Sequence, residues 1–186
     1  MADRGGKHMS YLSSAAWIAH DLGLATTIGG TLFGQGALHP ALNERLDDNQ
    51  QRMEVADAAW RKFSWLNLAA HTLFAATWLV GRTMLSGREV SKTSRTLTQV
   101  KDGLVVASLV TGVGSIVLGR ILGKKVRERE GFEAGEDASI RRLRIAVRTL
   151  GQVNLLAVAG VAAVTTGLSM EASKSLPFSY VSRRLP

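Results

Sequence analysis

The sequence predicts an all-α fold, an integral membrane four-helix bundle, from three observations. The 186 residues are 46% hydrophobic and 20% charged, and the charged residues cluster outside four long apolar segments. Each segment is long enough for a helix to cross ~30 Å of hydrocarbon, which needs about 20 residues. The segments also lack the continuous polar stripe of a helix on the surface of a soluble protein. A soluble four-helix bundle is the alternative interpretation.

The predicted parts are two helical hairpins that polar segments separate and flank. They are an N-terminal tail (1–11), a first helical hairpin (12–86), a basic connection (87–99), a second helical hairpin (100–170) and a C-terminal tail (171–186). The predicted spans are residues 12–38, 64–85, 100–122 and 149–170. The first span is too long for a signal peptide and lacks a small-residue cleavage site behind a basic flank. Because Met9 is an alternative start, residues 1–8 carry no functional prediction.

The second and fourth spans are predicted to project beyond the bilayer on one side, here called side B. Residues 42–63 form an amphipathic extension with apolar residues at heptad-like spacing, which leads into the second span. Residues 138–148 form a helical extension that leads into the fourth span. The candidate N-caps are Asp47, Asp48 and Asn49 for the first extension, and Asp137 and Ser139 for the second. The chain ends and the basic connection lie on the opposite side, side A.

Aromatic and basic residues bear on how the spans sit in a membrane. Trp prefers the membrane–water interface, so Trp17 and Trp78 are expected near the side A surface, and Trp60 and Trp65 near side B. Lys and Arg are too evenly divided between the two sides to fix the orientation. We expect a bacterial-type inner (plasma) membrane with both termini in the cytoplasm, the common arrangement for an even number of spans.

The two hairpins resemble each other, which predicts a parallel two-fold repeat. His20-Asp21 in the first span corresponds to Lys101-Asp102 in the third, at an offset of about 81 residues. The Asn-Leu pair that starts at Asn67 in the second span likewise recurs in the fourth. Two spans per half would point equivalent spans in the same direction. Chance similarity between helices rich in Gly, Ala and Leu is the alternative.

Small residues recur along the predicted spans. They mark helix-packing faces, because lipid supplies no hydrophobic drive for helices to associate. The candidates are Gly30, Gly34, Gly112, Gly119, Gly160 and Gly167. Packing among the four spans is the favoured interpretation, and contact with another subunit is the alternative.

Ionisable residues inside membrane helices are costly, so each marks a candidate functional site. A polar intramembrane cluster is predicted near side A from His20, Asp21, Lys101 and Asp102, which lie at matching depths in the repeat. The cluster is expected to be structural, with a proton or cation site as the alternative. His71 lies near the middle of the second span and needs a hydrogen-bond partner there. The candidate partners are Thr27, Thr111 and Asn154.

Two histidines in adjacent spans raise the alternative of a haem or another tetrapyrrole, because histidines commonly ligate haem iron. His20 and His71 differ by ~10 Å in predicted depth, from the 1.5 Å rise per residue, whereas two axial ligands of one iron lie at nearly equal depth. A single-histidine haem site, a quinone contact or a magnesium ligand on His71, with His20 as a second candidate, therefore stays open. A chain without a cofactor is the first expectation.

Several function classes are excluded or unsupported by the sequence. The absence of cysteine excludes disulfides, thiolate zinc sites, iron–sulfur clusters and cysteine nucleophiles. The motifs of serine hydrolases, zinc proteases and phosphate-binding loops are also absent. We therefore expect no catalytic residues, no metal site and no enzyme activity. The net charge of +8 is attributed to basic residues that flank the spans and meet anionic lipid head groups, and no nucleic-acid partner is expected.

The first span resembles bacterial four-helix integral membrane proteins related to the copper-resistance D type. The residues that carry the resemblance are His20, Gly29-Gly30, Leu32-Phe33 and Pro40-Ala41-Leu42. The resemblance implies a four-helix membrane fold and, for the nearest family members, copper transfer. This chain lacks the density of Met and His that copper transfer needs, so that activity is not expected here.

Taken together, these features predict a non-enzymatic accessory or scaffolding subunit of a larger membrane complex. Its expected partners are membrane lipids and other membrane protein subunits. The first alternative is a haem- or quinone-binding electron-transfer protein that uses His71. The second is a small ion or metabolite transporter built on the repeat, with Asp21 and Asp102 at equivalent depths.

Overall fold

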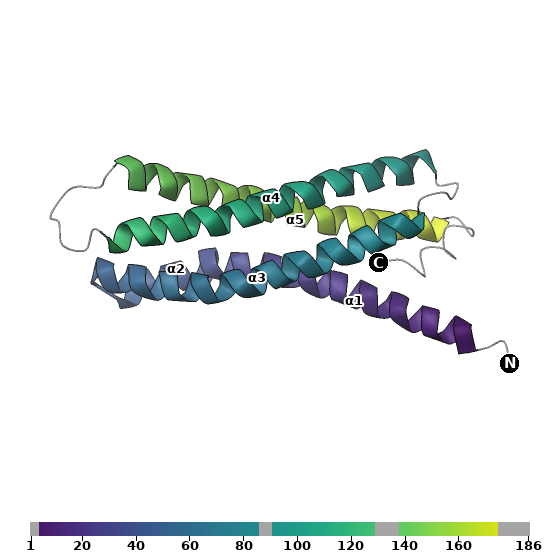
Figure 1. The fold of residues 1–186 in the computed structure, drawn as a ribbon, viewed down its shortest axis with the longest axis horizontal. Coiled ribbons are helices and arrows are strands. Elements are labelled where there is room, and N and C mark those ends of the chain that lie inside the picture. Colours follow the sequence, from purple (N-terminus) through teal and green to yellow (C-terminus); the bar gives the residue numbers. More distant parts are fainter. Residues whose placement is uncertain (1–3, 86–90, 129–137, 175–186) are drawn as a thin grey trace.

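The computed structural model describes residues 4–85, 91–128 and 138–174. Over these residues the fold is all-α, and four long helices pack together along the length of the molecule (Figure 1). The elements are α1 (Arg4–Phe33), a π-helical turn η1 (Gly34–Leu38), α2 (His39–Arg45), α3 (Asn49–Leu85), α4 (Lys92–Arg127) and α5 (Ala138–Lys174). The predicted all-α fold with four packed helices is confirmed.

The helices form two hairpins that lie side by side. The helix α1 packs along α3, and α4 packs along α5, while contacts of α1 with α5 and of α3 with α4 join the hairpins. The helices α1 and α4 therefore lie diagonally opposite each other, as do α3 and α5. Figure 1 shows that α1 begins and α5 ends at the same end of the bundle, the end called side A, whereas α2 lies at side B.

The chain leaves α1 through a widened turn rather than a simple helix end. The π-helical turn Gly34–Leu38 comes directly before Pro40, which lies in the first turn of α2. Proline has no amide hydrogen and its ring displaces the preceding turn, so a wider turn accommodates it. The helix then ends where Leu46 takes an extended conformation, and Asp48 Oδ1 accepts a hydrogen bond from the Gln50 amide at 2.9 Å. Asp48 is thus the acceptor at the start of α3.

Two helices begin earlier than the sequence predicts. The helix α4 starts at Lys92, inside the stretch 87–99 that was expected as a connection, because Ser91 caps it by accepting from the Ser94 amide at 3.1 Å. Ser94 and Thr98 are buried against the other helices, so packing supports this polar first part of α4. The helix α1 likewise begins at Arg4, within the expected tail. The candidate cap Asp137 lies outside the described residues.

Glycines allow close contacts within both hairpins. A side chain on Gly30 would collide with the Phe63 ring, and one on Gly34 would collide with Trp60, so α1 can meet these aromatic rings of α3 only through glycine. Gly112 lies against His71 and Asn154, Gly160 against Leu104, and Gly167 against Leu97. Gly119 faces open space.

The distribution of side chains is unusual for a water-soluble bundle. The interior contains an apolar cluster around Phe74 and Trp78, and it also holds buried charged and polar residues, among them His20, Lys101 and Asn154. Large apolar side chains lie on the outside; Trp65 is 65% exposed, Val110 66% and Leu156 72%. Within the described residues, α4 and α5 are the helices long and apolar enough to cross a membrane, over Lys92–Val126 and Ala138–Glu171. The criterion is one of length and composition, which core helices of soluble proteins also meet.

Candidate functional site

The first buried polar cluster joins α1 to α4 across the centre of the bundle. His20 is fully buried and Lys101 is 1% exposed, and Lys101 Nζ donates to His20 Nε2 at 3.1 Å. The other ring nitrogen, Nδ1, donates to the Phe74 carbonyl at 3.0 Å. An ammonium group only donates and a carbonyl only accepts, so this geometry requires a neutral imidazole with its hydrogen on Nδ1.

The Lys101 ammonium has further favourable neighbours. It lies 4.0 Å from the centre of the Trp78 ring, a cation–π contact. Trp78 Nε1 donates to Asp102 Oδ1 at 2.8 Å, and Arg82 Nε donates to Asp102 Oδ2 at 3.1 Å. The carboxylates of Asp21 and Asp102 both act electrostatically on Lys101. The Asp102 carboxylate and the Lys101 ammonium thus both lie against the Trp78 ring, next to a neutral imidazole.

The second polar cluster joins α3 to α5 and surrounds His71. His71 is 3% exposed, and its Nδ1 donates to the Asn67 carbonyl at 2.8 Å. Its Nε2 accepts from Asn154 Nδ2 at 3.2 Å. The same amide nitrogen donates to the Ser108 carbonyl at 2.6 Å and lies 3.2 Å from Thr111 Oγ1. Asn154, one of the three expected partners of His71, therefore ties α5 to both α3 and α4.

A buried phenylalanine separates the two clusters. The Phe74 ring is fully buried and its centre lies 6.2 Å from that of His20 and 5.2 Å from that of His71. Its apolar ring interrupts any continuous chain of hydrogen bonds between the two histidines. The clusters are consequently two separate polar sites along the bundle.

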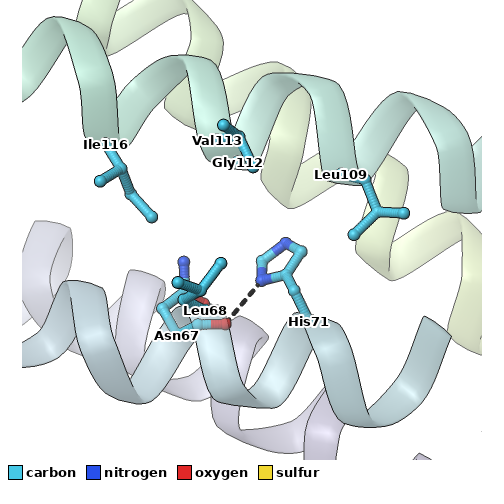
Figure 2. Close-up of a pocket in the computed structure, with 7 residues that line it drawn as sticks. All are labelled: Asn67, Leu68, His71, Leu109, Gly112, Val113 and Ile116. Atoms are coloured by element: carbon cyan, nitrogen blue, oxygen red, sulfur yellow. Dashed lines mark hydrogen bonds between the residues drawn. The ribbon is translucent and has the colours of Figure 1, made fainter. Parts of the chain in front are cut away.

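A small cavity lies beside His71, between α3 and α4 (Figure 2). Its volume is about 10 Å³, which is at the lower limit for one water molecule. The residues around it are Asn67, Leu68, His71, Leu109, Gly112, Val113 and Ile116. The Asn67 side-chain oxygen is buried without a hydrogen-bond partner. The cavity thus combines an apolar wall with one unsatisfied acceptor.

The arrangement does not fit a haem or another tetrapyrrole on either histidine. Both ring nitrogens of His20 and both of His71 are engaged by protein atoms, so neither imidazole presents a nitrogen to a metal. The cavity beside His71 is also far smaller than the ~300 Å³ or more that sites for larger ligands have. In the part of the chain that the structure describes, no group of three or more His, Asp or Glu side chains is arranged to hold a metal ion.

Of the expected side A cluster, the structure brings together His20, Lys101 and Asp102, whereas Asp21 is exposed. Trp78 and Phe74 belong to the site as well, although the sequence does not place them there. Trp78 was expected at the membrane interface, but it is 2% exposed and lies between Lys101 and Asp102. Phe74 had no assigned role, because a phenylalanine in an apolar helix carries no distinguishing signal. From the sequence, the contact between Lys101 and His20 can be predicted only because the two residues lie at the same depth in their spans.

Comparisons with protein-family models, with curated proteins and with solved structures find no match to this chain.

Proposed function

We propose that this protein is an integral membrane protein that serves as a non-enzymatic accessory or scaffolding subunit of a larger membrane complex. The membrane assignment is supported by the exposed apolar side chains on all four long helices together with charged groups held in the interior. The buried Lys101 side chain is hydrogen-bonded to His20, as a membrane interior demands of a buried polar group.

The charge distribution along the helices supports the same proposal. The chain has four stretches without Asp, Glu, Lys or Arg, which are 22–43, 63–81, 103–119 and 149–170. The first runs from α1 through η1 into α2, and the others lie within α3, α4 and α5. The shortest, 103–119, is ~25 Å long as a helix, close to the ~30 Å hydrocarbon core of a bilayer. Charged residues follow directly at its ends, where lipid head groups and water would receive them.

One observation favours a scaffolding role over cofactor binding. The ring nitrogens of both interior histidines are committed to hydrogen bonds within the chain, and the described cavity beside His71 has room for about one water molecule. The features left to recognise another molecule are on the outer surface. They include the apolar face of α1 with Leu22 and Leu32, on which Gly29 is exposed to open space.

A parallel repeat is part of the proposal. His20 and Lys101 are 81 residues apart, so their contact joins positions that the repeat would make equivalent. The contact of His71 with Asn154 does not join equivalent positions, because the repeat pairs Asn154 with Asn67. Both contacts cross between diagonally opposite helices. Equivalent residues meet in this way along a two-fold axis that runs through the centre of a bundle.

Alkaline carbonate extraction and blue-native electrophoresis together test the proposal. We expect the protein to stay in the membrane pellet at high pH and, after mild detergent extraction, to migrate in a complex well above its 20.0 kDa mass. Release into the supernatant would contradict the membrane assignment. A lone 20 kDa species after extraction would contradict the scaffolding role.

The orientation can be tested cleanly because the sequence contains no cysteine. We propose that side A, with both termini, faces the cytoplasm of a bacterial-type inner membrane. Thr93→Cys at the start of α4 and Arg142→Cys near the start of α5 place single exposed thiols at opposite ends of the bundle. A membrane-impermeant maleimide added to intact cells is expected to label Arg142→Cys and spare Thr93→Cys, and the reverse pattern would invert the orientation.

A second candidate function is proton or cation transport, favoured by the buried Lys101 side chain, which is hydrogen-bonded to His20 and lies on the Trp78 ring beside Asp102. The test is ion flux into liposomes that contain the purified protein, with Asp21→Asn/Asp102→Asn as the variant. Flux that falls in the variant would support transport. Flux that is absent, or equal in both proteins, would contradict it.

A further inference from the structure

The contact between α3 and α4 ends at side B in an exposed aromatic and basic pair. Arg120 on α4 lies over the Trp65 ring on α3, with 5.4 Å between the guanidinium carbon and the ring centre. The Trp65 side chain is 65% exposed. Trp is the residue that prefers the level of lipid head groups, and Arg is a cation that binds phosphate. The pair therefore has the chemistry of a membrane interface.

This pair lies one helical turn from the cavity beside His71. Leu68, which lines the cavity, is three residues from Trp65, and Ile116, which also lines it, is four residues from Arg120. Residues three or four apart share one face of a helix. The cavity and the Trp65–Arg120 pair thus form one continuous track along the line where α3 and α4 meet, and Figure 2 shows the cavity residues of both helices facing each other there.

The track is apolar inside and cationic at its side B end. Leu109, Val113 and Ile116 of α4 form its apolar wall. Lys124 follows Arg120 by one turn and is 74% exposed; its partner Glu128 is 3.6 Å away and 60% exposed, so this ion pair is weak and leaves the ammonium accessible. On the α3 side, Arg61 is paired with Asp57 at 2.8 Å and adds no net charge.

We propose that the line between α3 and α4 binds one anionic phospholipid, with its phosphate at Arg120 and Lys124 and one acyl chain over the exposed side of Val113. The chain lies outside the cavity, which has room for about one water molecule. The inference rests on the membrane location proposed above. Charge complementarity selects the head group, because Arg120 and Lys124 place two cations beside one carboxylate, that of Glu128, at this end of the track. The buried Asn67 oxygen next to Leu68 is an acceptor for a hydroxyl of the lipid or for a water molecule beneath it.

The lipid preference of the purified protein in nanodiscs tests the head-group half of the proposal. The discs contain equal amounts of dioleoyl-phosphatidylglycerol and dioleoyl-phosphatidylcholine, and lipid that stays bound is identified by native mass spectrometry. We expect bound phosphatidylglycerol to exceed phosphatidylcholine in the wild type, and the ratio to fall about tenfold in Arg120→Gln/Lys124→Gln. The matched control is Arg141→Gln/Arg142→Gln, which removes the same charge from exposed positions of α5 at the same end.

A second pair of variants tests the acyl-chain half. Val113→Trp fills the track, whereas Val110→Trp places the same side chain on another exposed face of α4. We expect loss of bound phosphatidylglycerol in Val113→Trp alone. Equal amounts of the two lipids on the wild type, or an equal loss in a variant and its control, would overturn the lipid site. If the protein stays in the membrane pellet in carbonate while these results fail, only this inference is lost.

Discussion

The two hairpins contribute opposite chemistry to the contacts between them. At both polar clusters the α1–α3 hairpin supplies a histidine whose Nε2 accepts, and the α4–α5 hairpin supplies a nitrogen that donates, from Lys101 in one case and Asn154 in the other. Two lysines at the first pair of positions would meet donor to donor, because an ammonium group has no acceptor. The difference teaches that the two hairpins are complementary in hydrogen bonding at both polar clusters.

The largest loss of stability is expected where a substitution places two like charges together at the first cluster. His20→Lys would place two ammonium groups side by side in a buried site, and leaving a buried charge without compensation costs about 3–5 kcal/mol. Thermal unfolding in detergent, followed by circular dichroism, should show a large loss of stability. The exchange His20→Lys/Lys101→His restores one donor and one acceptor, and we expect it to recover part of the loss. An exchange variant no more stable than His20→Lys alone would contradict the complementarity of the halves.

The first hairpin also differs from the second in how its helices approach each other. Gly30 and Gly34 receive the Phe63 and Trp60 rings, and Gly30→Leu or Gly34→Leu should destabilise the protein by about 1–3 kcal/mol through overpacking. Gly29 supplies the control, since nothing lies near a side chain built there. Unfolding of Gly29→Leu should match the wild type. If Gly29→Leu is as damaging as Gly30→Leu, an unseen contact covers the outer face of α1.

A smaller effect is expected at the second cluster. Asn154→Leu removes the donor to His71 Nε2 and leaves an acceptor unsatisfied, yet hydrogen bonds between membrane helices average only about 0.6 kcal/mol. We expect a loss of about 1 kcal/mol in the same unfolding assay. Asn154→His, which can still donate to His71, should lose less. Equal losses in the two variants would mean that packing against Gly112, rather than the hydrogen bond, sets the stability of this cluster.

The sequence predicts four packed helices, and of the expected side A cluster it predicts the contact between His20 and Lys101. Apolar runs define the four long helices, and the matching depth of His20 and Lys101 follows from counting residues along two helices. Burial of Trp78 could not be predicted, since it depends on the tertiary contacts of its ring with Lys101 and Asp102. The starting point of α4 was also missed, because only the packing of Ser94 and Thr98 explains a helix in such a polar stretch.

The smallest loss of stability is expected at Arg82, at the outer edge of the first cluster. Its size shows whether the residues of the cluster act as one network or as separate pairs. Arg82 and Asp102 have side chains that are each 38% exposed, and ion pairs in such positions contribute about 0–1 kcal/mol. Arg82→Gln should therefore lower the midpoint of thermal unfolding only slightly. Lys101→Met removes the donor to His20 in the buried centre, so it should lower the midpoint clearly. If Arg82→Gln is as destabilising as Lys101→Met, the network is cooperative and includes Arg82, Asp102, Trp78 and Lys101. Exposure would then not determine how much each residue contributes to stability.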